Sequence, residues 1–198
     1  MADVFLMGTS GSANDPNRSR WREPIKEACE RAGISCFDPV LPEWNEEAMQ
    51  AELDALRTAR VIAMAVTADT AGLASLAESG WAALSALQRK QAFGIFIDTM
   101  FMATGIAPNV DLTMSVASKD LLQALMGHKK TDEPVSESEG TIEQLAEASR
   151  RARKLVGGHA NELAKQFPEL NLFVAGSVRE LAEWTVNTAK LKANEPRP

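Results

Sequence analysis

Short apolar runs alternate with amphipathic segments over the first hundred residues, and this alternation limits the folds that the chain can adopt. The runs occupy residues 4–7, 61–66 and 93–97, and a further short strand is expected at 34–37, where Ser35 interrupts the apolar residues. Residues 61–66 are all apolar, which is typical of a strand covered on both faces of a sheet. Strands that alternate with helices at this spacing predict parallel pairing with right-handed crossovers. We therefore expect a three-layer, flavodoxin-like or Rossmann-like α/β fold with helices on both faces of the sheet.

The segments between the runs have the apolar spacing of helices. A first helix is expected to start near Trp21 and to end at Gly33, because glycine favours the position just after a helix. Asn45 is a candidate N-cap for a second helix. The expected buried face of this second helix carries Met49, Leu53 and Leu56. A third helix is predicted over residues 76–88.

The second half of the chain is expected to complete the same sheet. Residues 172–175 predict a fifth strand, and residues 178–191 predict a closing helix. Before them we predict a short helix, then a flexible loop or insertion, then a long helix. These three segments occupy residues 119–126, 127–140 and 141–167. The long helix is expected to bend at the glycine pair 157–158, since each glycine costs a helix interior about 1 kcal/mol. We interpret residues 1–198 as one domain with a helical or loop insertion around 118–168.

Charge and composition exclude several functional classes. The formal net charge is −6, from 21 Lys and Arg against 27 Asp and Glu, so we expect no binding to nucleic acid polymers or to membrane surfaces. No apolar run reaches the about 18 residues of a membrane span, and the basic start of a secretory signal is missing. Two cysteines and two histidines supply neither a disulfide framework nor a zinc site. We predict a cytoplasmic protein that uses no metal or other cofactor.

In sheets of this type the ligand binds beyond the carboxyl ends of the strands. The expected loops at this edge are residues 8–19, 38–45, 67–75 and 98–109. They lack the glycine patterns of dinucleotide-binding and P-loop proteins and the nucleophile elbow of hydrolases. The candidates for chemistry at this edge and on its flanking helices are Glu52, Asp54, Asp69, Thr70 and Glu78. Convergent carboxylates suit glycosyl chemistry, because a carboxylate can stabilise or trap the positive charge that develops at the anomeric carbon.

Each of these carboxylates also has a structural interpretation. Ser75 and Glu78 have the S-x-x-E spacing of a capping box, in which the glutamate only stabilises the start of a helix. Glu52 and Asp54 lie two residues apart, so they do not share one helix face and are equally compatible with solvated surface. The residue pattern leaves the catalytic and structural roles open.

Four short segments follow one another in a characteristic order. They are V-F-L-x-G-T at 4–9, F-D-P-V-x-P-x-W at 37–44, E-x-D at 52–54 and T-x-D-x-x-G-x-x-S-x-x-E at 67–78. Together they resemble the nucleoside 2-deoxyribosyltransferase superfamily, specifically its deoxyribosyltransferase-like branch, over roughly residues 4–100. The resemblance implies a flavodoxin-like sheet and cleavage of the N-glycosidic bond of 2′-deoxynucleosides. In purine and pyrimidine salvage, such enzymes transfer the deoxyribose to another base.

The resemblance also implies roles for individual residues. Glu78 is expected to attack C1′ and form a covalent deoxyribosyl-enzyme, which a second base or water then resolves. Asp69 or Thr70 is expected to bind the sugar or base, and Asp54, close to Glu52, to protonate the leaving base. The candidate binding residues are Gly8, Thr9, Ser10, Pro42, Trp44, Glu52, Thr70, Gly72 and Ser75.

The implied partners are small molecules, namely a nucleoside or nucleotide and a free base, in a homo-oligomer. The chain contains no tyrosine, so either Thr9 or Ser10 replaces the tyrosine that holds the nucleophile in the family's transferases, or that role is absent. Three alternatives remain. One is a nucleoside monophosphate N-glycosidase whose phosphate site uses the loop at 8–12 with Arg18, Arg20 and Arg22. The others are a non-catalytic nucleotide-sensing module and an NAD-cleaving enzyme related to Toll/interleukin-receptor domains.

Overall fold

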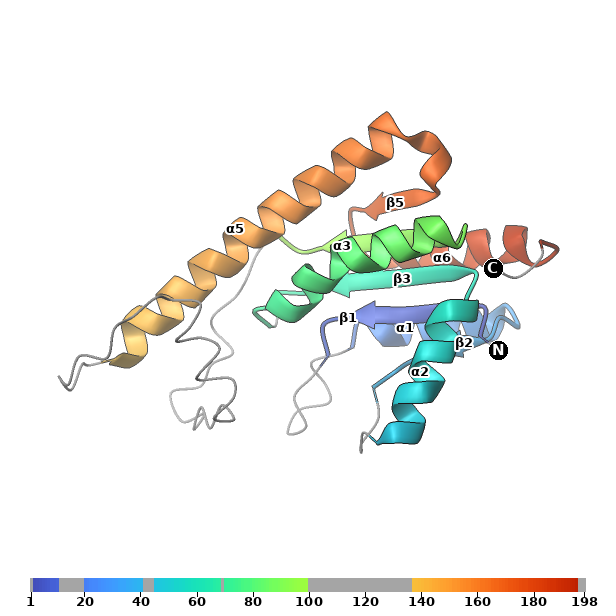
Figure 1. Ribbon diagram of the computed structural model, residues 1–198, viewed down its shortest axis with the longest axis horizontal. Coiled ribbons are helices and arrows are strands. Elements are labelled where there is room, and N and C mark those ends of the chain that lie inside the picture. The colour runs from blue at the N-terminus through green and yellow to red at the C-terminus, as the bar shows by residue number, and fades with distance from the viewer. Residues whose placement is uncertain (1, 11–19, 41–44, 69, 100–136, 196–198) are drawn as a thin grey trace.

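A parallel sheet forms the centre of the molecule. The computed structural model describes residues 2–10, 20–40, 45–68, 70–99 and 137–195. The strands are β1 (Val4–Gly8), β2 (Cys36–Phe37), β3 (Val61–Val66), β4 (Ala92–Ile97) and β5 (Leu172–Ala175). Within the described residues they form a five-stranded, all-parallel sheet in the order β2-β1-β3-β4-β5 (Figure 1). This is the flavodoxin-like doubly wound order, so the predicted fold class is confirmed.

Helices cover both faces of this sheet (Figure 1). The elements are α1 (Arg22–Arg31), α2 (Glu46–Thr58), α3 (Leu73–Gln88), α5 (Glu137–Gln166), a short 3-10 helix (Pro168–Leu170) and α6 (Val178–Lys192). Alternate strand residues face opposite sides: Val4 and Leu6 pack with α1 and α6, whereas Phe5 and Met7 pack with α2 and α3. Helix α5 joins the second cluster through Ala152 and neighbouring residues.

The predicted start of α2 is confirmed, but its predicted buried face is wrong in part. The Asn45 side chain accepts a hydrogen bond from the Ala48 amide at 2.8 Å, as an N-cap does. Met49 and Leu53 are 37% and 43% exposed, respectively. The buried residues of α2 are Ala55 and Leu56 instead. The helix therefore packs on the sheet only through its carboxyl-terminal half.

Two helix boundaries differ from the prediction. Helix α3 begins at Leu73 rather than at residue 76, and α5 begins at Glu137, inside the segment expected to be a loop. Helix α5 also continues through Gly157 and Gly158, where an added Cβ would meet no atom within 4 Å. The short helix expected at 119–126 lies outside the described residues. In the described part of the chain, no helix combines the length and hydropathy needed to cross a membrane.

Helix α6 lies unusually close to the sheet at Gly94. A Cβ placed on this β4 glycine would lie 2.3 Å from the Trp184 ring and 2.9 Å from Leu181. The Trp184 ring stacks on Phe173 of β5, with ring centroids 5.1 Å apart. The missing glycine side chain therefore makes room for an aromatic pair that packs α6 and β5 against β4.

Candidate functional site

The carboxyl ends of β1 and β3 meet in a close backbone contact at Gly8. This residue has a φ of +119°, and a Cβ on it would lie 2.0 Å from the Ala65 carbonyl oxygen, so only glycine fits. The next residue, Thr9, donates its amide to Ala65 at 2.9 Å and is 2% exposed. Its Oγ1 lies 2.8 Å from Oγ1 of Thr67, the first residue after β3. The two strand ends thus present a pair of linked hydroxyls at the predicted ligand edge.

Behind Thr9, the Arg22 side chain holds the backbone from the α1 side. Its guanidinium donates to the carbonyls of Thr9 and Gly8 at 2.5 and 3.3 Å, and its Nε lies 3.1 Å from Oδ1 of Asp38. The Trp21 indole also donates to the Thr9 carbonyl, at 2.8 Å. Burial lowers the pKa of Arg22, and the nearby Asp38 carboxylate opposes that shift. Arg22 is 2% exposed and engaged in these contacts, which disfavours the phosphate-binding role considered for it.

The loop between β3 and α3 is held by a buried arginine from the second half of the chain. Arg153 of α5 is 0% exposed. Its terminal nitrogens donate to four backbone carbonyls, those of Val66 (3.3 Å), Thr67 (2.9 Å), Thr70 (2.6 Å) and Asp98 (2.9 Å). Its Nε donates to Ser149 Oγ at 3.0 Å, and that hydroxyl in turn donates to the Ala71 carbonyl at 2.7 Å. This set of contacts is called the Arg153 clamp below.

Helix α3 begins at Leu73 after the N-cap Gly72, and this start removes the capping interpretation of Glu78. Gly72 is the N-cap, with a left-handed φ of +62° and no side-chain cap. Ser75 is buried inside the first turn, so the predicted capping box of Ser75 and Glu78 is wrong. Glu78 lies in the second turn, is exposed, and makes no hydrogen bond or ion pair with the residues that the structure describes. Its carboxylate is accessible from solvent.

The remaining predicted residues are spread over the same edge and the α2 surface. Ser10 is exposed just after Thr9, and Thr70 is half-buried with its carbonyl in the Arg153 clamp. Glu52 is half-buried on α2, whereas Asp54 is exposed and accepts a hydrogen bond from Gln50 at 3.1 Å. Pro42, Trp44 and Asp69 lie outside the described residues.

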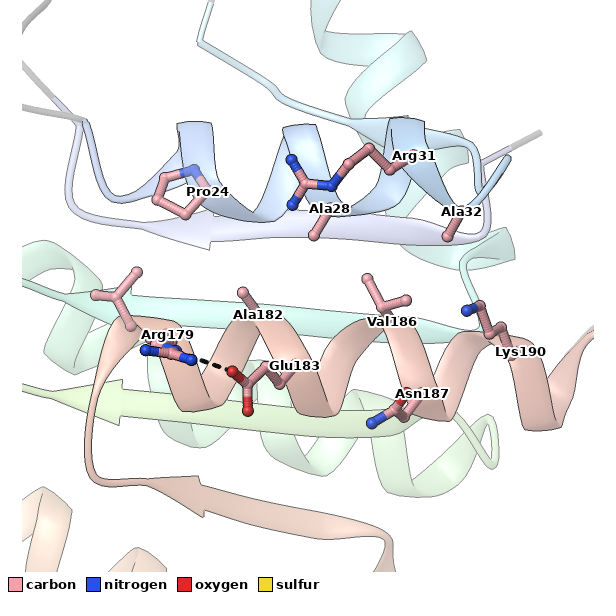
Figure 2. A pocket seen from close by; sticks show the side chains of 11 residues that line it. Pro24, Ala28, Arg31, Ala32, Arg179, Ala182, Glu183, Val186, Asn187 and Lys190 are labelled. Atoms are coloured by element: carbon pink, nitrogen blue, oxygen red, sulfur yellow. Dashed lines mark hydrogen bonds and ion pairs between the residues drawn. The ribbon is translucent and has the colours of Figure 1, made fainter.

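A hollow lies between α1 and α6. Its volume is about 640 Å³. Figure 2 shows Ala28 and Ala32 of α1 opposite Ala182 and Val186 of α6, with Arg179 paired to a glutamate beside them. None of the predicted site residues that the structure describes lines this groove. Among the residues that the structure describes, no group of three or more His, Cys, Asp and Glu side chains is arranged to hold a metal ion.

Sequence reasoning missed Arg153 and Ser149 entirely. Both lie on α5, about 80 residues after the loop that they hold, and neither belongs to a recognisable motif. Asp38 belongs to the F-D-P-V segment at residues 37–40, but its pairing with Arg22 depends on how α1 packs beside β2. In the sequence, Arg153 stands out only as a cation among small and apolar residues on one face of α5. Exposed arginines elsewhere on the same helix cannot be told from it by sequence.

The first half of the chain matches a known family. The family model described as nucleoside 2-deoxyribosyltransferase like matches residues 1–94, which confirms the resemblance for this part of the chain. Comparisons with curated proteins and with solved structures found no match. Thr9, Thr67 and Glu78 lie within the matched residues, whereas Ser149 and Arg153 lie beyond them.

Proposed function

We propose, from the similarity of residues 1–94 to nucleoside 2-deoxyribosyltransferases, that the chain cleaves the N-glycosidic bond of 2′-deoxynucleosides with Glu78 as the nucleophile. One observation carries this proposal: Glu78 is accessible, has no structural partner among the described residues, and lies on the helix that starts at the ligand edge. Capping a helix or pairing with a cation would by itself explain why a glutamate is present. Among the described residues, Glu78 neither caps α3 nor pairs with a cation.

The proposed reaction needs a carboxylate in its ionised form. The Glu78 carboxylate attacks C1′, an ester bond forms there, and the bond between C1′ and the base nitrogen breaks. The leaving base takes a proton from a neighbouring acid, for which Asp54 remains the candidate, and Asp69 or Thr70 is proposed to hold the sugar or base. A second base, or water, then attacks C1′ and releases Glu78. The reaction balances without a redox partner or a cofactor.

Burial divides the proposed binding residues into two groups. The Thr9 hydroxyl is buried and bonded to Thr67, so it is suited to shaping the loop rather than touching the substrate. Ser10 is exposed beside it and is the better candidate to replace the family's tyrosine. Gly8 and Gly72 remain proposed binding residues only through their main chain, because protein atoms of Ala65, and of Val66 and Arg153, occupy the space beside their Cα atoms. The buried Ser75 is proposed to support the first turn of α3.

The proposed partners are a deoxynucleoside, or its monophosphate, and a free base, handled by a cytoplasmic homo-oligomer. The surface of α3 supports the assembly. Leu73, Trp81 and Leu84 on this helix are 40%, 54% and 57% exposed, and Glu78 is the only charged residue of the 16. An exposed helix face with so little charge is typical of an interface. Analytical ultracentrifugation of the full chain measures the state directly.

The test is one chromatographic assay. The protein is incubated with deoxyinosine and free cytosine and, in parallel, with deoxynucleoside monophosphates. Formation of deoxycytidine means transfer, and free hypoxanthine alone means hydrolysis. Glu78→Gln keeps the shape of the side chain and should lower turnover at least about 1,000-fold, as expected when a nucleophile is lost. Glu30→Gln, an exposed glutamate of α1, is the matched control.

A covalent intermediate gives a second readout. Rapid quenching followed by mass spectrometry should find one deoxyribosyl group on the peptide that contains Glu78. Turnover that survives in Glu78→Gln would refute the assignment of the nucleophile. No turnover of any substrate by the unmodified protein, together with nucleotide binding in calorimetry, would replace the enzyme with a nucleotide sensor.

A further inference from the structure

We infer that Arg153 is a positioning residue of this site: it fixes the loop between β3 and α3, and with it the start of the helix that carries Glu78. The inference rests on the proposed function for its catalytic consequence, but its structural part stands on the geometry alone. Arg153 and its partner Ser149 lie outside the residues that match the family. Through these two residues, the second half of the chain therefore contributes to the site by holding its main chain.

The Arg153 clamp uses the whole hydrogen-bonding capacity of the guanidinium. Arginine has five N–H donors in a fixed planar fork. The Nε donor is used by Ser149, the two donors of one terminal nitrogen by Val66 and Asp98, and those of the other by Thr67 and Thr70. All five donors thus have acceptors among the described residues, and four of the five acceptors are main-chain carbonyls. The arrangement is therefore suited to holding main chain.

The carbonyls that it holds lie on two adjacent strands and one loop. Val66 ends β3, and its carbonyl also accepts the amide of Asp98, the residue that follows β4, at 2.8 Å. Thr67 and Thr70 belong to the loop itself, and Ser149 adds the Ala71 carbonyl at 2.7 Å. Helix α5 thus fixes nearly every described residue of the loop from one side. Without α5, the part-buried carbonyls of Thr67, Thr70 and Asp98 would each lose a hydrogen bond, which a protein interior disfavours.

The clamp continues directly into α3. A Cβ on Gly72, the N-cap, would lie 3.1 Å from Arg153 Nη2 and 2.7 Å from Val66 Cγ1, so the guanidinium packs against the helix start. The Gly72 carbonyl accepts the first helical hydrogen bond, from the Leu76 amide at 2.8 Å. Glu78 lies two residues after Leu76, in the second turn of the helix. A shift of about 1 Å in this start would move the carboxylate out of line with C1′, and such shifts cost about 100-fold in rate.

The experiment compares variants of one helix in the full chain. Arg153→Lys keeps the charge but offers three donors in place of five. Ser149→Ala is the milder second variant, because it removes the Nε acceptor and the Ala71 contact. Arg151→Lys is the matched control, since Arg151 is exposed on the same helix. Two readouts are taken well below the measured unfolding temperature: kcat and KM, and hydrogen exchange of the peptide covering residues 66–76.

For Arg153→Lys, kcat should fall about 10- to 100-fold while KM changes less than about 3-fold, and the Thr67 and Leu76 amides should exchange at least about 10-fold faster. Ser149→Ala should show the same pattern with a smaller change, and Arg151→Lys should match the unmodified chain. Wild-type kcat and exchange in Arg153→Lys would overturn the inference. So would a loss of activity equal to the fraction unfolded by circular dichroism. If the unmodified chain has no glycosidic activity, the proposed function fails, and the exchange readout alone decides on the clamp.

Discussion

Neutralising Asp38 tests how strongly the site depends on the buried cation behind Thr9. The guanidinium of Arg22 is 2% exposed and lies 3.1 Å from the Asp38 carboxylate, which is 19% exposed. Asp38→Asn keeps the size of the side chain and removes its charge. Arg22 would then keep two backbone carbonyls and a Trp21 ring centred 4.3 Å away, but it would lose its anion.

The expected destabilisation follows from this geometry. Breaking a fully buried pair costs about 3–5 kcal/mol, because one charge stays buried without compensation. Since Asp38 keeps some solvent and Arg22 keeps its carbonyls, we expect a loss of about 2–4 kcal/mol in the free energy of unfolding. For a chain of this size that corresponds to a fall of about 5–15 °C in Tm. The candidate site should also weaken, since the same arginine holds Gly8 and Thr9.

Urea denaturation followed by circular dichroism measures the effect. Glu23→Gln is the matched control on α1: its pair with Lys26 spans 3.0 Å, but the two side chains are 58% and 41% exposed. We expect that control to change stability by less than about 1 kcal/mol. A double-mutant cycle with Arg22→Met isolates the pair. If Asp38→Asn unfolds at the same urea concentration as the control, the buried pair makes no special contribution and the reasoning is refuted.

Two further predictions concern glycines and thiols. Gly94→Ala should lower the free energy of unfolding by about 1–3 kcal/mol, because its Cβ would lie 2.3 Å from the Trp184 ring. Gly157→Ala, whose Cβ would meet no atom within 4 Å, should raise the free energy of unfolding by about 0.5–1 kcal/mol. Thermal melts in which both variants shift Tm in the same direction would contradict this prediction. The hydrogen bond from Cys36 lowers the pKa of the buried Cys29 thiol, and the same bond with burial raises the pKa of Cys36. The protonated Cys36 and the buried Cys29 should therefore react with iodoacetamide at pH 8 far more slowly in the folded chain than in urea. Mass spectrometry measures both rates, and equal rates would contradict the hydrogen bond between the two thiols.

The parts of the fold that follow from local pattern could be predicted from the sequence. The fully apolar run that forms β3 and the turn at Gly33 depend on short-range physics, namely burial on both faces and a left-handed residue after a helix. The parallel pairing of the strands followed from the alternation of strands and helices, whereas their order did not. The exposed Met49 and Leu53 show the limit, because apolar spacing alone did not indicate how much of α2 reaches the sheet.

Candidate site residues could be proposed from the sequence only where one segment contains them. Gly8 and Glu78 were proposed because they lie at the end of one strand and near the start of one helix. The start of α3 was placed three residues late, since a left-handed glycine cap and an S-x-x-E capping box compete for the same stretch and only the geometry of Gly72 decides between them. The Arg153 clamp and the Arg22–Asp38 pair depend on how distant elements pack, so no local pattern reveals them.

The position of β5 and α6 limits how this chain can be shortened. Strand β5 pairs with β4 through four registered residues, and α6 covers the β1 and β3 core residues on one face. A fragment cut at residue 94 would end inside β4, leave that strand as an open edge and uncover Val4, Leu6 and Ala63. Such a fragment is expected to be insoluble on expression. The point at which sequence similarity stops is therefore not a point at which the polypeptide can be divided.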